Sequence, residues 1–192
     1  TPKCGYQLNK NILSGAIAQD EKCVYKFTMP DYNLCLNDIF VKNDHNVVIN
    51  SNQIKNVSVD IPDGVISGNG CLTINSLENV SNEENFKDKA ENFDISNYFD
   101  FSLEEIIFKN GDSSKEGWKT PITNLNKPID ITLELGDSLK GKKRYCVLRE
   151  HEGEVDNLNG IYSSQNSTIK FNTDKFSSYA LGSSDTVRTL TK

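Results

Sequence analysis

The chain has 192 residues, 36% of them hydrophobic and 25% charged, which is the composition of a folded protein with a lean hydrophobic core. Its formal net charge is -6, and the Lys and Arg residues are dispersed among more numerous carboxylates, so we expect no nucleic-acid partner, which would require a basic stripe. No apolar run approaches the roughly 18 residues of a membrane-spanning helix, and we expect no membrane span in this chain.

The first part of the chain, residues 1–45, is predicted to form a small β-unit. It opens on a polar stretch without an initiator Met, and we expect the chain to be a piece of a longer protein. In the segment "CVYKFTMPDYNLCLNDIFV", Phe27 precedes the turn signal "MPDYN", and three apolar residues follow it. These three residues are Leu34, Leu36 and Ile39.

The five cysteines do not form a recognisable metal motif. There is no C-x-x-C pair, and the chain has only two His residues, so we expect no metal and no cofactor. Cys71 and Cys146 lie within apolar, strand-like runs, where a Cys usually serves as a small buried hydrophobe. Whether any of Cys4, Cys23 and Cys35 are bridged is left open by their spacing.

The remainder of the chain shows the period of two that is typical of β-strands, and we predict a β-sandwich domain over residues 46–182. The strand-like runs are 56–61, 71–77, 129–135, 144–148 and 168–173. Turn signals separate them at 62–64, 67–70, 110–112, 151–154 and 163–167. Residues 183–192 read as a polar tail or linker. The predicted fold is therefore an all-β, antiparallel sandwich with a small N-terminal β-unit and one short helix.

The one predicted helix covers residues 81–93, "SNEENFKDKAENF". Ser81 is a candidate N-cap, and Glu84 stands three residues later, as in a capping box. Lys87 and Lys89 follow toward the C-terminal end, where they complement the helix dipole. The alternative interpretation of this segment is a solvated loop.

Two polar segments are candidate ligand sites. "KGKKR" at 140–144 reads as a charged hairpin turn, with nucleic-acid or glycosaminoglycan binding as the alternative. "DNLNG" at 156–160 has a little calcium-loop character but lacks the ordered pattern of an EF-hand. His151, in the charged turn "REHEGE", is expected on the surface. The carboxylate pairs Asp94 with Asp100 and Glu104 with Glu105 are interpreted as a solvated face.

Four aromatic residues that fall outside the predicted strands are candidates for ligand binding. Planar aromatic faces stack on sugars and anchor protein interfaces, although a single aromatic in a loop more often packs onto its own domain. The candidates are Trp118, Tyr98, Phe99 and Tyr162. Trp118, in a polar segment before a proline, is the most prominent of them. The expected partner is a protein or a glycan that the sequence does not identify.

Two stretches resemble known families. "YKFTMPDYNLCL" (25–36) resembles the ending of internalin-B-type β-repeats, although the aromatics expected upstream are reduced to Tyr6. Residues 127–181 resemble a C-terminal β-domain of Firmicutes cell-wall and adhesin-like surface proteins. "VSVDIPDGVISGNGCLTI" (57–74) is similar to the opening of such domains and, distantly, to autoproteolysis-inducing sandwich domains. The resemblances imply an extracellular module, secreted or anchored to the cell wall of a Gram-positive bacterium.

The distant similarity raises the question of self-cleavage at Lys175, Phe176 and Ser177. In the self-cleaving relatives, a His activates a hydroxyl two residues later, which attacks the preceding carbonyl. Here the position of the base is occupied by Lys175, whose ordinary pKa of about 10.4 leaves it protonated at neutral pH. We therefore expect no catalytic residues and interpret this segment as the approach to the last strand of the sandwich.

The function expected from the sequence is a non-enzymatic, monomeric module for structural display or adhesion. Two alternatives stay open: a self-processing sandwich domain, and a carbohydrate-binding module of a surface hydrolase. An intramolecular Lys–Asn isopeptide bond is not expected, because the Lys and Asn residues in the strands fall mainly at outward positions, whereas this chemistry requires them to be buried.

Overall fold

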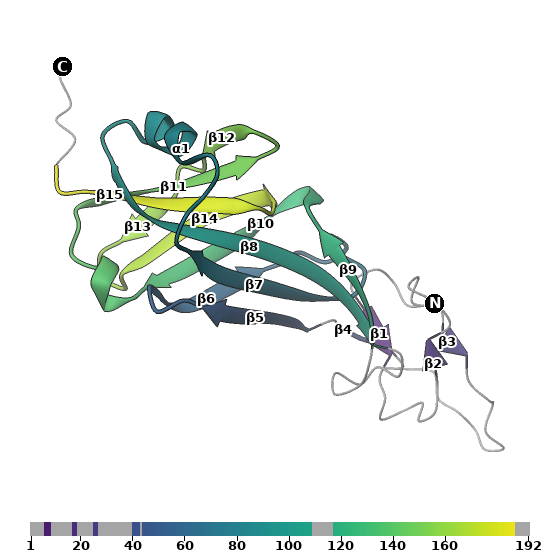
Figure 1. Cartoon of the computed structure of the whole chain (residues 1–192). Coiled ribbons are helices and arrows are strands. Elements are labelled where there is room, and N and C mark those ends of the chain that lie inside the picture. The colour runs from purple at the N-terminus through teal and green to yellow at the C-terminus, as the bar shows by residue number, and fades with distance from the viewer. Residues whose placement is uncertain are drawn as a thin grey trace. The chain divides into compact units, whose positions relative to one another are not determined.

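The computed structural model describes residues 6–8, 17–18, 25–26, 40–42, 44–108 and 117–186 (Figure 1). The strands that precede the helix are β1 (Tyr6–Leu8), β2 (Ile17–Ala18), β3 (Tyr25–Lys26), β4 (Phe40–Lys42), β5 (His45–Asn50), β6 (Ile54–Asp60) and β7 (Asn69–Leu77). The helix α1 (Glu83–Ala90) is followed by β8 (Asp94–Phe108), β9 (Gly117–Ile122), β10 (Asn124–Leu135) and the 3-10 helix η1 (Asp137–Leu139). The last strands are β11 (Arg144–His151), β12 (Glu154–Asn157), β13 (Ile161–Ser163), β14 (Thr168–Lys175) and β15 (Ser178–Ser184).

The chain forms two compact units. The first consists of Thr1–Asn46, Ile61–Leu72 and Leu103–Ile122, and the second of Val47–Asp60, Thr73–Ser102 and Thr123–Lys192. In the first unit, β1 pairs with β4, β2 pairs with β3, and the end of β8 pairs with β9, all antiparallel.

Several predictions for this unit lie outside the described residues. They concern Cys4, Cys23, Cys35, Phe27, Leu34, Leu36, Ile39 and the turn at 110–112. The predicted division into 1–45, 46–182 and 183–192 stays a prediction.

The second unit is a β-sandwich. One sheet has the strand order β13-β14-β10-β6, and the other runs β12-β11-β15-β8-β7-β5. Aromatic rings from both sheets meet between them: Phe101 on β8 stacks on Tyr179 of β15 at 4.2 Å and lies 6.3 Å from Phe171 on β14. The predicted all-β sandwich with one short α-helix is confirmed.

The period-two pattern arises because alternate residues of each strand face the core. On β10, Ile129, Ile131, Leu133 and Leu135 are buried, whereas the residues between them are partly exposed. Four of the five predicted strand segments lie within β7, β10, β11 and β14, and the fifth, 56–61, extends one residue beyond the end of β6 at Asp60.

The predicted helix is present, but its predicted cap is wrong. The helix begins at Glu83 after Asn82, and no side-chain hydrogen bond caps it. It is held instead by Phe86 and Ala90, which pack on Tyr98 and other residues of the outer sheet face. Because this apolar contact positions the helix, a capping box at Ser81 is not needed.

The segment 140–144 does not form a hairpin turn, because β10 and β11 belong to different sheets. The chain crosses from one sheet to the other through η1. Tyr145 holds this crossover, since its hydroxyl donates to the carbonyl oxygen of Leu139 and accepts a 3.2 Å hydrogen bond from the backbone N–H of Lys142. The basic residues therefore lie at one end of the sandwich.

Gly182 on β15 is required by the close approach of its neighbours. A Cβ atom at this position would lie 2.6 Å from the Sγ of Cys146 on β11 and 3.0 Å from the Cβ of Phe93. We expect Gly182→Ala to lower the free energy of unfolding by about 1–3 kcal/mol, measured by urea denaturation. In a Cys146→Ala background the same substitution should be milder, because the sulfur is gone; strictly additive effects would contradict this explanation.

Candidate functional site

The candidate site lies where the chain leaves the edge of β11. Strand β12 pairs only with Leu148–His151, and after Asn157 the chain crosses to β13 in the other sheet. The crossing is held by a 2.9 Å hydrogen bond from the N–H of Leu158 to the carbonyl oxygen of Val147. Within the described chain, the first half of β11 therefore lacks a strand on this side.

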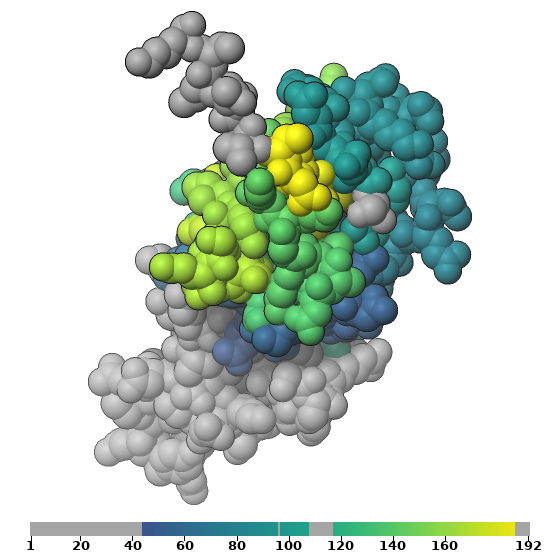
Figure 2. Space-filling model, turned by 90° about the vertical axis from the view of Figure 1, so that its left-hand side faces the viewer, coloured from purple at the N-terminus to yellow at the C-terminus, as the bar shows by residue number. Residues whose placement is uncertain are grey.

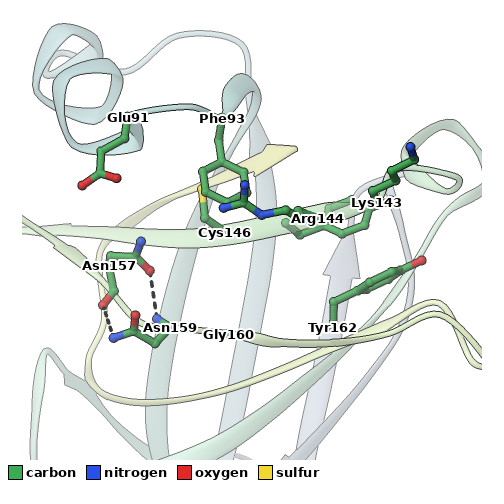
Figure 3. Close-up of a pocket in the computed structure, with 10 residues that line it drawn as sticks. Glu91, Phe93, Lys143, Arg144, Cys146, Asn157, Asn159, Gly160 and Tyr162 are labelled. Carbon is green, nitrogen blue, oxygen red and sulfur yellow. Dashed lines mark hydrogen bonds between the residues drawn. The ribbon is translucent and has the colours of Figure 1, made fainter. Parts of the chain in front are cut away.

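A pocket of about 380 Å³ occupies this place (Figure 3). Its volume falls at the lower end of the range of roughly 300–1,000 Å³ for small-molecule sites. It is lined by Glu91, Phe93, Lys143, Arg144, Tyr145, Cys146, Asn157, Asn159, Gly160 and Tyr162. Figure 2 shows this end of the second unit, with the residues of α1 and after it in teal, the segment before β11 in green and the β13 region in lime.

Charged groups stand on opposite sides of the pocket. The guanidinium of Arg144 lies 4.6 Å above the ring of Phe93, a cation–π contact that holds its plane in place. Lys143 precedes it, and Glu91 projects from the opposite side, after α1 (Figure 3). The lining therefore includes two cations and one carboxylate, and the ammonium of Lys143 is directed away from the other side chains (Figure 3).

Two asparagines form the floor of the pocket in this view. The Oδ1 of Asn157 accepts a 2.9 Å hydrogen bond from the N–H of Asn159, and the Nδ2 of Asn159 donates to the carbonyl oxygen of Asn157 at 3.3 Å (Figure 3). Asn159 has a left-handed backbone with φ 51°, which Asn tolerates better than most residues. These bonds orient the Nδ2 of Asn157 and the Oδ1 of Asn159 as a donor and an acceptor for the pocket.

Aromatic and apolar groups complete the wall. The rings of Tyr145 and Tyr162 lie 4.4 Å apart, so one side of Tyr162 is supported by the sandwich. Burial raises the pKa of Tyr145 and raises the pKa of the Cys146 thiol to about 11. Cys146 is therefore a neutral thiol at physiological pH, and it contributes an apolar surface rather than a nucleophile.

The four predicted binding aromatics are not brought together. All of them lie on strands, so the expectation that they stand outside strands is wrong. Tyr98 is 7% exposed and Phe99 2% exposed, and both are parts of the core. Trp118 is half-buried on β9 in the first unit, and ligand binding by it stays a prediction. Tyr162 is the candidate that lines the pocket.

Phe176 and Ser177 connect β14, which ends at Lys175, with β15. Phe176 is buried, and its N–H donates to the carbonyl oxygen of Thr123 at 2.9 Å. The hydroxyl of Ser177 donates to the carbonyl oxygen of Glu150 on β11. Phe176 thus fills the core, as expected for the approach to the last strand, and the hydroxyl is directed toward another strand.

The surface position predicted for His151 is wrong. Its turn is a hairpin between β11 and β12, but the residue is only 8% exposed, because it is the last residue of a strand whose alternate side chains face the core. Among the residues 44–108 and 117–186, no three His, Cys, Asp or Glu side chains gather as a metal site. Asp100 accepts a hydrogen bond from Ser102, and Glu105 accepts from the backbone N–H groups of residues 67 and 68.

Sequence reasoning missed most of the pocket. It noted three parts of the lining, the basic segment 140–144, the segment 156–160 and Tyr162, but interpreted them separately. The signal available was the unusual density of polar residues in both segments. Their proximity depends on strand pairing, which the sequence does not reveal.

Comparison with known proteins adds no relative: no family model, no curated protein and no solved structure matches this chain. In the part of the chain that the structure describes, no helix is long and apolar enough to cross a membrane.

Proposed function

We propose that this chain is a non-enzymatic, extracellular module of a Gram-positive surface protein that serves in adhesion or display. The observation that carries the proposal is the polar pocket at one end of the sandwich, which contains groups suited to recognition. The resemblance of residues 127–181 to cell-wall and adhesin-like domains supports the extracellular setting.

The chemistry of the pocket favours binding over catalysis. Arg144 is stacked on a ring, the asparagines are hydrogen-bonded to each other, and the thiol of Cys146 is held neutral. Groups held in this way provide oriented hydrogen bonds to a ligand. The carbohydrate-binding module is the second candidate, because Tyr162 and the two asparagines offer both a ring and amide groups to a sugar.

A binding array tests the proposal. The fluorescently labelled chain is applied to immobilised glycans and extracellular-matrix proteins, together with Arg144→Gln and the control Lys55→Gln. Both variants remove one positive charge, but Lys55 is exposed and does not line the pocket. We expect retention that falls about 10-fold for Arg144→Gln and is unchanged for Lys55→Gln. Absence of retention on every surface, or equal retention of both variants, would contradict the proposed recognition role.

Mass spectrometry of the intact chain distinguishes the proposed non-enzymatic module from the self-processing alternative. The expected result is a single species at the full calculated mass, because Ser177 is engaged with Glu150 and lacks a histidine base. A species ending at Phe176 would show self-cleavage and overturn the proposal. A deficit of one ammonia would contradict the expectation that no isopeptide bond forms.

A further inference from the structure

We infer that the pocket binds an acidic saccharide, a sugar ring that carries a carboxylate, such as a uronic acid. The inference rests on the proposed function, since it names the ligand class of the same pocket. Three features carry it: the local charge, the pairing of hydrogen-bond donors with acceptors, and the tyrosine ring.

The local charge of the pocket is opposite to that of the chain. Lys143 and Arg144 outnumber Glu91 in the lining, whereas the whole chain has a formal net charge of -6. The Cζ atom of Arg144 lies over the ring of Phe93 at 4.6 Å, and the N–H groups at the edge of the guanidinium are donors that can meet an anion. A carboxylate is the group that such a planar donor matches best.

The other polar groups favour a ligand that is rich in hydroxyls over a simple anion. The Nδ2 of Asn157 is a donor, whereas the Oδ1 of Asn159 and the carboxylate of Glu91 are acceptors. A sugar hydroxyl both donates and accepts, so it can satisfy either kind of group. A fully ionised inorganic anion such as sulfate has no hydrogen to give to Glu91 and would be repelled by it. The cations and Glu91 on opposite sides therefore fit a carboxylate at one end of the ligand and hydroxyls at the other.

The ring of Tyr162 supplies the apolar contact. One of its sides packs on Tyr145 at 4.4 Å, and the residue is only partly buried, so part of the ring is open to the pocket. The C–H faces of a pyranose ring pack well on such a surface. The volume of about 380 Å³ suits a small ligand rather than a folded partner.

The test is a titration of the whole chain with D-glucuronate, D-glucose and acetate, followed by two-dimensional NMR and calorimetry. We expect glucuronate to bind at least about 10-fold more tightly than either glucose or acetate, with shifts at Tyr162, Asn157 and Asn159. Affinity for glucuronate should decrease as salt is added, because the contact is charged.

Variants distinguish the pocket from adventitious binding. Asn157→Asp keeps the oxygen that accepts from Asn159 but replaces the donor by a negative oxygen. We expect this variant to have an affinity for glucuronate that is lower by about 10-fold or more, with a much smaller change in the affinity for glucose. Arg144→Gln should lose glucuronate binding as well, whereas the control Lys55→Gln should not. Thermal unfolding of each variant verifies that it is folded.

The outcomes separate this inference from the proposed function. Equal affinity for glucuronate and glucose at the pocket would overturn the preference for an acid and leave a neutral-sugar site. If none of the three probes binds but retention on the array still depends on Arg144, the inference of a saccharide ligand would be wrong. The pocket would then recognise a ligand of another class. If no probe binds and retention on the array does not depend on Arg144, the proposed function would be wrong as well.

Discussion

Replacing Phe101 by Ala is expected to lower the free energy of unfolding by about 3–5 kcal/mol. Phe101 is 1% exposed and lies between the sheets, in contact with Phe99, Tyr179 and Phe171. Removing the ring leaves a cavity where the aromatic contacts of the sandwich converge, and the flanking strands cannot close it because both are fixed by sheet pairing. Urea denaturation, followed by tryptophan fluorescence and circular dichroism, measures the change.

The matched control is Ile161→Ala, which removes a large apolar side chain that is 74% exposed. This variant should remain within about 0.5 kcal/mol of the parent chain. A similar loss for both variants would show that burial between the sheets is not the source of the effect. A loss below about 1 kcal/mol for Phe101→Ala would contradict the central packing role of this ring.

Replacing Arg149 by Ala is expected to lower the free energy of unfolding by about 3 kcal/mol. Its guanidinium is buried and connects two strands of one sheet with β14 of the other. It contacts Asp156 at 2.9 Å, Asp174 at 2.8 Å and the hydroxyl of Thr173 at 3.0 Å. The substitution removes these bonds and leaves space in the interior. Thermal and urea unfolding are the measurements.

Arg149→Met separates the charge from the packing. Met fills much of the same space without a charge, and the side chains of Asp156 and Asp174 are 52% and 44% exposed and can be solvated, so we expect it to recover a large part of the stability lost in Arg149→Ala. An exposed pair provides the second control: Lys55 and Glu134 lie 2.5 Å apart at the surface, and Lys55→Ala should change stability by less than about 1 kcal/mol. A loss below about 1 kcal/mol for Arg149→Ala would show that the buried network does not stabilise the sandwich.

The strands that the sequence predicted best are those with one buried face. In β10, apolar and polar residues alternate without interruption over Ile129–Leu135, and the structure buries the apolar set. Strand β8 was missed, although it spans Asp94–Phe108. Here Phe99 and Phe101 face the other sheet, while Tyr98 faces α1, so both sides are apolar and the alternation disappears. Burial of both sides thus removes the alternation from β8, whereas β11, which also packs against α1, is predicted from its short apolar run.

The candidate site was predictable only in fragments. The segments 140–144 and 156–160 are separated in sequence, and each one alone resembles an ordinary turn. They meet because β11 lies in one sheet, β13 lies in the other, and the chain crosses between them at Gly160. An added Cβ at Gly160 would lie 3.0 Å from a methyl group of Ile169 and 3.2 Å from a methyl group of Val147, so these side chains would have to shift slightly to admit a larger residue.

The sequence by itself determined the fold class, because a period of two and local turn chemistry depend only on neighbouring residues. It also determined the charge and the location of the strands β6, β7, β10, β11 and β14. Tertiary structure alone decided which strands are neighbours, and therefore that Tyr98 and His151 are buried and that Arg144, Asn157 and Tyr162 line one pocket. The physical reason is that alternation along the sequence shows which residues lie on the same side of a strand. Which element packs against that side depends on contacts between residues that are far apart in the chain.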